Sequence, residues 1–128
     1  MLVVASRQIS KYKNNANDEV TVMPVYNKLV RDKIPSIINK SGKLAQICIL
    51  SDAEYQDALS EKLNEEIEEL IEAQTREERL EEADDVLTVL EAFLCHYGLT
   101  MQEVEQVKVN KEVSHGGFSQ RIFLEEVK

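Results

Sequence analysis

Three copies of one helix-start pattern divide the second half of the chain and fix where its helices begin. The pattern is a hydroxyl residue followed three positions later by glutamate, and it occurs at Ser51–Glu54, Thr75–Glu78 and Thr100–Glu103. In such a capping box each side chain accepts a hydrogen bond from the other residue's backbone amide, which a helix start otherwise leaves unpaired. Because an amphipathic run follows each pattern, we expect helices over about residues 52–73, 76–97 and 101–113.

A shorter helix is predicted over Ile34–Lys40, with Asp32 near its start, Pro35 in its first turn and Gly42 after its end. Gly98 is the expected cap at the end of the middle long helix.

The short connection near Gln74–Thr75 makes the first two long helices an antiparallel hairpin. "KLAQICIL" at residues 43–50 and "GGFSQRIFLEEV" at residues 116–127 have the composition of extended segments, the second as a glycine turn followed by a short strand. The predicted fold class is therefore mainly all-α, with short extended segments at the ends.

The whole-chain composition narrows the class of protein. With 128 residues, 43% hydrophobic and 30% charged, the chain suits one soluble domain. Cys48 and Cys95 lie far apart without a CxxC motif, so neither a disulfide framework nor a zinc site is indicated, and the cytoplasm is the expected location. A net charge of −9 argues against nucleic acid as a partner, and no run of residues resembles a membrane span.

Two acidic stretches, "LNEEIEEL" at Leu63–Leu70 and "LEEADDVL" at Leu80–Leu87, raise the question of where their carboxylates point. At about 100° per residue, Glu66 falls at the edge of the apolar stripe of the first long helix, and Glu69 lies beside it. The stripe itself comprises Leu59, Leu63, Ile67, Leu70 and Ile71, whereas Glu65, Glu68 and Glu72 face solvent.

On the second long helix, Glu82 falls inside a broad apolar arc and Asp85 lies on its edge, whereas Glu81 and Asp84 face the polar side. The tight turn brings the two pairs of inward acids to within about 3 Å of the same level along the hairpin. Four converging carboxylates would raise one another's pKa and weaken the fold unless a cation joined them. Oxygen ligands suit a hard divalent ion, above all Mg²⁺ shared with a polyphosphate.

Other interpretations compete with this cation site. A run of glutamates on a helix is most often a solvated face, which fits Glu65, Glu68, Glu72, Glu77 and Glu81 but not Glu82. A di-iron bundle needs Glu-x-x-His pairs, and His96 at the end of the hairpin has no glutamate at that spacing. Basic residues that could bind phosphate bracket the acidic hairpin: Lys28, Arg31, Lys33, Lys108, Lys111 and Arg121.

"EEIEE" followed by "EADD" resembles the EExxE…ExxD signature of the all-α nucleoside triphosphate pyrophosphohydrolase superfamily, which includes MazG proteins, dimeric dUTPases and phosphoribosyl-ATP pyrophosphohydrolase. The flanks "MPVYNKLVRDKIPSII", "ILSDAEYQDAL", "DDVLTVLEAF" and "NKEVSHGGFSQRIFL" resemble the small MazG-like, phosphoribosyl-ATP-pyrophosphohydrolase-like proteins. The likeness runs from Met23 to the C-terminus, so we expect a domain at 23–128 and an N-terminal extension at 1–22. Asp84 departs from the pattern, because the family usually carries a small residue there.

The resemblance implies a catalytic set and its ligands. Glu66, Glu69, Glu82 and Asp85 would bind the metal, as one or two Mg²⁺ ions with Mn²⁺ as an alternative. Glu65, the first acid of EExxE, would act through water or in another subunit. Phosphate contacts are expected from Lys28, Arg31, Lys111 and Arg121. Superfamily members build a four-helix core from two chains, and the broad apolar face predicts a homodimer or homotetramer.

The expected function is Mg²⁺-dependent hydrolysis of a nucleoside triphosphate between its α and β phosphates, giving a monophosphate and pyrophosphate, in the manner of enzymes that remove non-standard nucleotides. One alternative is the same reaction on phosphoribosyl-ATP. The other is an acidic helical module that binds a nucleotide or a protein without turnover.

Overall fold

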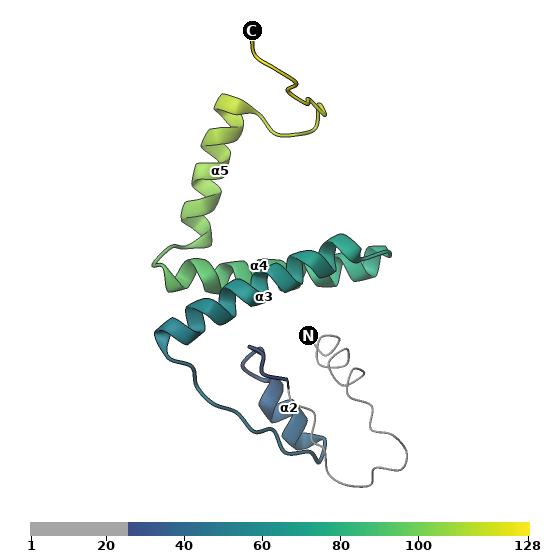
Figure 1. The fold of residues 1–128 in the computed structure, drawn as a ribbon, viewed down its shortest axis with the longest axis vertical. Coiled ribbons are helices and arrows are strands. Elements are labelled where there is room, and N and C mark those ends of the chain that lie inside the picture. The colour runs from purple at the N-terminus through teal and green to yellow at the C-terminus, as the bar shows by residue number, and fades with distance from the viewer. Residues whose placement is uncertain (1–25) are drawn as a thin grey trace. The chain divides into compact units, whose positions relative to one another are not determined.

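The computed structural model describes residues 26–128, which form four helices and no strand (Figure 1). The helices are α2 (Ile34–Lys40), α3 (Asp52–Glu72), α4 (Arg76–His96) and α5 (Met101–His115). The chain divides into two compact units, with the boundary between Phe93 and Leu94 inside α4. The all-α prediction is confirmed, whereas the proposed N-terminal extension lies outside the described residues.

Two of the predicted capping boxes are complete. Ser51 Oγ accepts a hydrogen bond from the Glu54 amide at 3.3 Å, and the Glu54 carboxylate accepts one from the Ser51 amide at 3.0 Å. At the start of α5, the Thr100 hydroxyl and the Glu103 carboxylate exchange the same pair of bonds at 3.1 and 2.9 Å. Local sequence alone therefore sets where α3 and α5 begin.

The box at the start of α4 closes differently. Thr75 Oγ1 accepts from the Glu78 amide at 3.1 Å, as predicted. The Glu78 carboxylate, however, accepts from the amide of Gln74 at 3.0 Å, one residue earlier than in the other two boxes. The glutamate thereby ties the start of α4 to the three-residue connection that follows α3.

Gly98 ends α4 as expected. Its φ of 75° lies in the left-handed region that glycine tolerates best. The Gly98 amide donates to the carbonyl of Cys95 and the Leu99 amide to that of Leu94, both at 2.9 Å, which is the Schellman arrangement.

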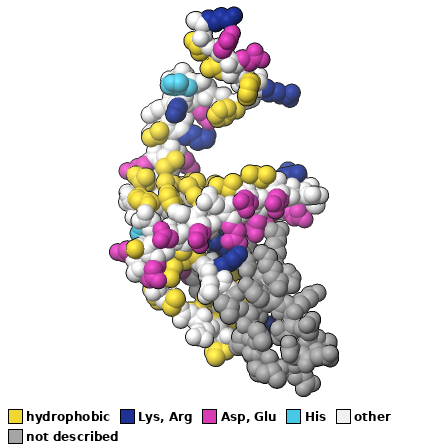
Figure 2. Space-filling model, viewed as in Figure 1, with side chains coloured by type: hydrophobic (Ala, Val, Ile, Leu, Met, Phe, Trp, Pro, Cys, Tyr) yellow, Lys and Arg dark blue, Asp and Glu magenta, His cyan; other side chains and the backbone are white. Residues whose placement is uncertain are grey.

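The α3–α4 hairpin has a small buried core for its length. Leu59 of α3 and Ala73 of the connection are buried, and Ile34 of α2 completes the buried hydrophobic set among residues 26–128. Several residues of the predicted stripes stay exposed, among them Ile71 at 77% and Leu87 at 55%, whereas others such as Leu63 and Leu90 are half-buried. A two-helix hairpin gives each helix one long neighbour, so an apolar arc broader than one contact remains uncovered. Figure 2 shows exposed hydrophobic side chains beside a row of acidic ones along this hairpin.

The two segments with strand-like composition form no strand. Residues 43–50 and 121–128 have no regular secondary structure, and Ile49 and Phe123 are almost fully exposed. A strand needs a neighbour to pair its backbone groups, and none is provided among the described residues. The prediction of a short C-terminal strand is therefore wrong for this chain by itself. Within residues 26–128, no helix has both the length and the apolar character that crossing a bilayer requires.

We predict that Ser51→Ala lowers the free energy of unfolding by about 1 kcal/mol, because the substitution leaves the Glu54 amide without its cap. Ser60→Ala is the matched control, since Ser60 lies exposed in the interior of the same helix and bonds only back to the Gln56 carbonyl. Urea unfolding followed by circular dichroism measures both. Equal effects of the two substitutions would contradict the capping role.

Candidate metal centre

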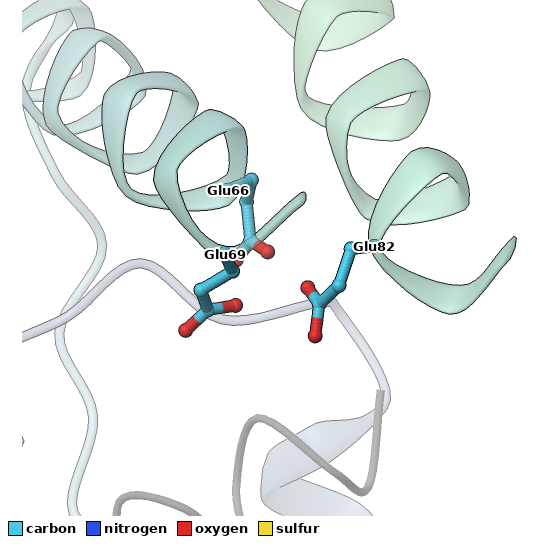
Figure 3. Close-up of side chains that lie close together, drawn as sticks. All are labelled: Glu66, Glu69 and Glu82. Atoms are coloured by element: carbon cyan, nitrogen blue, oxygen red, sulfur yellow. The ribbon is translucent and has the colours of Figure 1, made fainter. Parts of the chain in front are cut away.

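Three carboxylates from two helices converge on one point of the hairpin. Glu66 and Glu69 lie one turn apart on α3, and Glu82 faces them from α4 (Figure 3). Each offers an oxygen, and these oxygens all lie within 4.8 Å of one another. The pairing follows from the i, i+3 spacing on α3 and the short connection to α4, as the helical projection predicted.

Burial makes this carboxylate cluster costly. Glu66 and Glu82 are each 1% exposed, which places them with Leu59 as the most deeply buried large side chains. Glu69 is half-buried. A carboxylate removed from water loses hydration that only charge partners or ligands replace. The seam of the hairpin is thus occupied by acids at the level where an ordinary helical pair would place aliphatic side chains.

Lys62, which the sequence analysis did not single out, lies next to the cluster. Its Nζ is 3.1 Å from Glu66 Oε1, and its side chain is only 12% exposed. The signal that could have found it is simple, because a lysine four residues before an inward acid lies on the same helix face.

Burial raises the pKa of the Glu66 carboxyl above its ordinary value of 4.5, and the nearby Glu69 carboxylate raises it further. The Lys62 ammonium opposes both effects but does not cancel them. In the absence of a bound cation, the folded chain therefore holds the Glu66 proton more tightly than the unfolded chain does.

The donor set fits a hard divalent cation. All three clustered ligands are carboxylates, with no histidine or cysteine in any such cluster among the described residues. Glu66 Oε2 is buried and accepts no hydrogen bond from a described residue, so it has capacity for a ligand. Mg²⁺ binds through a few carboxylates and completes its shell with water and substrate phosphates, which suits a site with three protein oxygens.

The fourth predicted ligand, Asp85, is buried but does not join the cluster. Arg31, from the segment before α2, contacts Asp85 Oδ1 at 2.7 Å and Asp84 Oδ2 at 3.3 Å. The sequence projection located Asp85 at the right face of α4. A helical projection contains no information on the ion pair that Asp85 forms with Arg31, because Arg31 is distant in sequence.

Glu65 also has a basic partner. Lys28 Nζ lies 2.6 Å from Glu65 Oε1, and the Glu65 side chain keeps 28% of its exposure. The expectation that Glu65 faces open solvent is corrected, because the segment before α2 covers it. Two of the four predicted phosphate ligands, Lys28 and Arg31, thus lie beside the acids of the hairpin.

The other two predicted phosphate ligands belong to the second unit. Lys111 lies on α5 and Arg121 follows it, and both side chains are exposed. Their assignment to phosphate remains a prediction.

A family model that matches residues 48–111 places the chain in the all-α nucleoside triphosphate pyrophosphohydrolase superfamily, in agreement with the helical hairpin and its carboxylates. More specifically, the chain belongs to the phosphoribosyl-ATP pyrophosphohydrolase family, whose model matches residues 48–111. The matched range contains α3, α4 and the whole carboxylate cluster. The wider likeness, from Met23 and beyond residue 111, stays a prediction.

A relative from Mycolicibacterium smegmatis (strain ATCC 700084 / mc(2)155), described as an uncharacterized protein, is 52% identical to this chain over 54 residues. The alignment covers 42% of this chain and 55% of the relative, so the chain spans about half the length of the curated relative that it matches. No solved structure gives a significant match.

We predict that Glu66→Gln stabilises the metal-free protein at neutral pH, because glutamine cannot ionise and its carbonyl still accepts from Lys62. For the wild type, the contribution of Glu66 to stability is most favourable below pH 4.5 and is lost as pH rises through its raised pKa. Urea unfolding in EDTA between pH 4.5 and 7.5 measures the difference.

Glu68→Gln is the control for this experiment, since Glu68 is an exposed acid of the same helix. If Glu66→Gln is no more stable than wild type at pH 7, the buried carboxylate does not destabilise the folded protein.

Proposed function

We propose that this protein hydrolyses a nucleotide between its α and β phosphates, releasing pyrophosphate, with a divalent cation held by Glu66, Glu69 and Glu82. The observation that carries the proposal is the convergence of these three buried or half-buried acids within the segment that matches the family. A solvated helix face would leave such acids apart and exposed. The site instead concentrates negative charge that a divalent cation would neutralise.

Mg²⁺ would supply two chemical effects when bound: neutralisation of phosphate charge and a lower pKa for water. The three clustered carboxylates would hold the cation and fix its position relative to the hairpin. Glu66 is suited to be the most rigid ligand, because it is fully buried and Lys62 restrains one of its oxygens.

The remaining charged residues would act on the substrate itself. Lys28 and Arg31 are partly exposed, so their cationic groups can bind phosphate oxygens and offset charge on the leaving pyrophosphate. In the reaction, the oxygen of a water molecule bonds to one of the two phosphorus atoms. The bond from that phosphorus to the bridging oxygen breaks, and the bridging oxygen leaves with the other phosphorus. We assign acceptance of the water proton to Glu65, which lies next to Glu66 in the chain but outside the carboxylate cluster.

Phosphoribosyl-ATP is the substrate that the family match favours. Free nucleoside triphosphates are favoured by the MazG-like flanks, including "NKLVRDKIPSII" beside the acids. Both substrates carry the same triphosphate, so the same cation site and basic residues serve either.

We further propose that two or four copies of the chain assemble through the apolar surface of the hairpin. Leu80, Leu87 and Ile71 are more than half exposed although they lie on the predicted apolar arcs. Exposed apolar side chains gathered on one surface mark sites of protein–protein contact. A second hairpin of the same kind would bury it in a four-helix core.

The first test is pyrophosphate release from phosphoribosyl-ATP and a panel of canonical and modified nucleoside triphosphates, with Mg²⁺ and with EDTA. We expect Mg²⁺-dependent release that falls at least about a hundredfold in Glu66→Gln and in Glu82→Gln. Glu81→Gln is the matched control, because Glu81 neighbours Glu82 but is exposed. We expect it to retain wild-type activity.

Two outcomes of this test would contradict the proposal. Turnover that survives loss of Glu66 and Glu82 would place the chemistry elsewhere. Absence of turnover on every substrate, with Mg²⁺ still stabilising the fold, would favour a nucleotide-binding module.

We predict that sedimentation equilibrium gives a mass of two or four times the chain mass of 14.6 kDa. Leu87→Lys should lower this mass toward that of a single chain, because it places a charge in the apolar contact. Glu91→Lys, on an exposed position of the same helix, is the control and should leave the mass unchanged. A wild-type protein that sediments as one chain would exclude the proposed core.

A further inference from the structure

The segment before α2 places one basic side chain beside each helix of the acidic hairpin. Lys28 pairs with Glu65 of α3, and Arg31 pairs with Asp85 of α4. The Arg31–Asp85 ion pair is the more deeply buried of the two at its acidic end. The Asp85 side chain is only 7% exposed, whereas that of Glu65 is 28% exposed. A salt bridge of this kind holds a buried carboxylate that would otherwise be costly.

Asp85 is well placed to serve the cation site but does not do so in this arrangement. It follows Glu82 by three residues, so the two acids are neighbours on one face of α4, with Cβ atoms about 5–6 Å apart. Among residues 26–128, nevertheless, only Glu66, Glu69 and Glu82 bring carboxylate oxygens within 4.8 Å of one another. The carboxylate of Asp85 is instead directed to the Arg31 guanidinium at 2.7 Å.

The cluster and Asp85 differ in what they can hold. The oxygens of Glu66, Glu69 and Glu82 lie within 4.8 Å of one another, so they can converge on one divalent ion. Asp85 is already matched by Arg31, so a second divalent ion at this carboxylate would have to compete with the guanidinium.

Arg31 is accessible to an anionic ligand. Its side chain is 31% exposed, and a planar guanidinium binds phosphate oxygens through paired hydrogen bonds. Its second contact, with Asp84 at 3.3 Å, is to a side chain that is 66% exposed. The guanidinium is therefore partly open to solvent beside an exposed acid.

We propose that Arg31 covers Asp85 and thereby restricts the substrate-free protein to one divalent cation, and that nucleotide phosphate draws Arg31 away so that Asp85 binds a second cation. This inference rests on the proposed function, since it takes the nucleotide triphosphate as the ligand that moves Arg31. Binding of the nucleotide and of the second cation are then coupled, and each strengthens the other by the same factor.

The test counts bound Mn²⁺ per chain in the full-length protein, from the electron paramagnetic resonance signal of the free ion. The titration is made alone and with α,β-methylene-ATP, which cannot be cleaved between the α and β phosphates. We expect one bound ion per chain without the nucleotide and two with it. In Arg31→Met we expect two ions without nucleotide, because the guanidinium no longer covers Asp85.

Three further variants separate this role from general effects of charge. Asp85→Asn should bind one ion under both conditions. The double variant Arg31→Met with Asp85→Asn should return to one ion, and it also restores charge balance if Arg31→Met folds poorly. Arg79→Met removes an exposed arginine that makes no ion pair with a described residue, and it should behave as wild type.

The outcomes distinguish failure of this inference from failure of the proposed function. Two ions bound to the wild type without nucleotide, or one ion bound to Arg31→Met, would overturn the covering role while leaving the cation site intact. Absence of Mn²⁺ binding in every variant would overturn both, because the cluster of Glu66, Glu69 and Glu82 would then hold no cation.

Discussion

The convergence of Glu66, Glu69 and Glu82 at the seam of the α3–α4 hairpin is the constraint around which the rest of the first unit is arranged. Two of these acids are as buried as any hydrophobic side chain in the described part of the chain. Buried like charges destabilise a fold unless cations accompany them. Lys62 and Arg31, which lie beside the buried Glu66 and Asp85, meet that requirement.

The same constraint explains why so little apolar surface is buried. The part of the hairpin contact that holds carboxylates cannot also hold aliphatic side chains. Several residues of the apolar arcs, including Ile71 and Leu87, stay exposed. Leu59 is the one large aliphatic residue of α3 that is fully enclosed. We therefore expect stability to depend on what the chain binds, a cation at the seam and a second copy at the apolar surface, more than on its own core.

For a phosphate-cleaving site, this distribution of charge has a chemical use. Acids held close together attract a cation strongly, and partly exposed basic residues at their edge meet the phosphates that the cation brings. Arg31 stands at the junction of the two groups, since it neutralises one acid and is accessible to an anion. The coupling proposed for Arg31 would make full assembly of the site conditional on the substrate.

The sequence by itself determined the helices and which acids point inward. Capping boxes at Ser51 and Thr100 are local devices, and the inward placement of Glu66 and Glu82 follows from the helical period, so neither needs knowledge of distant residues. Only the tertiary structure decided which inward acids meet. Asp85 has the right helix face but pairs with Arg31, which lies 54 residues away, and no local rule specifies a contact over that separation. The absence of strands at residues 43–50 and 121–128 has the same origin, because strand formation depends on a partner and composition supplies only the tendency.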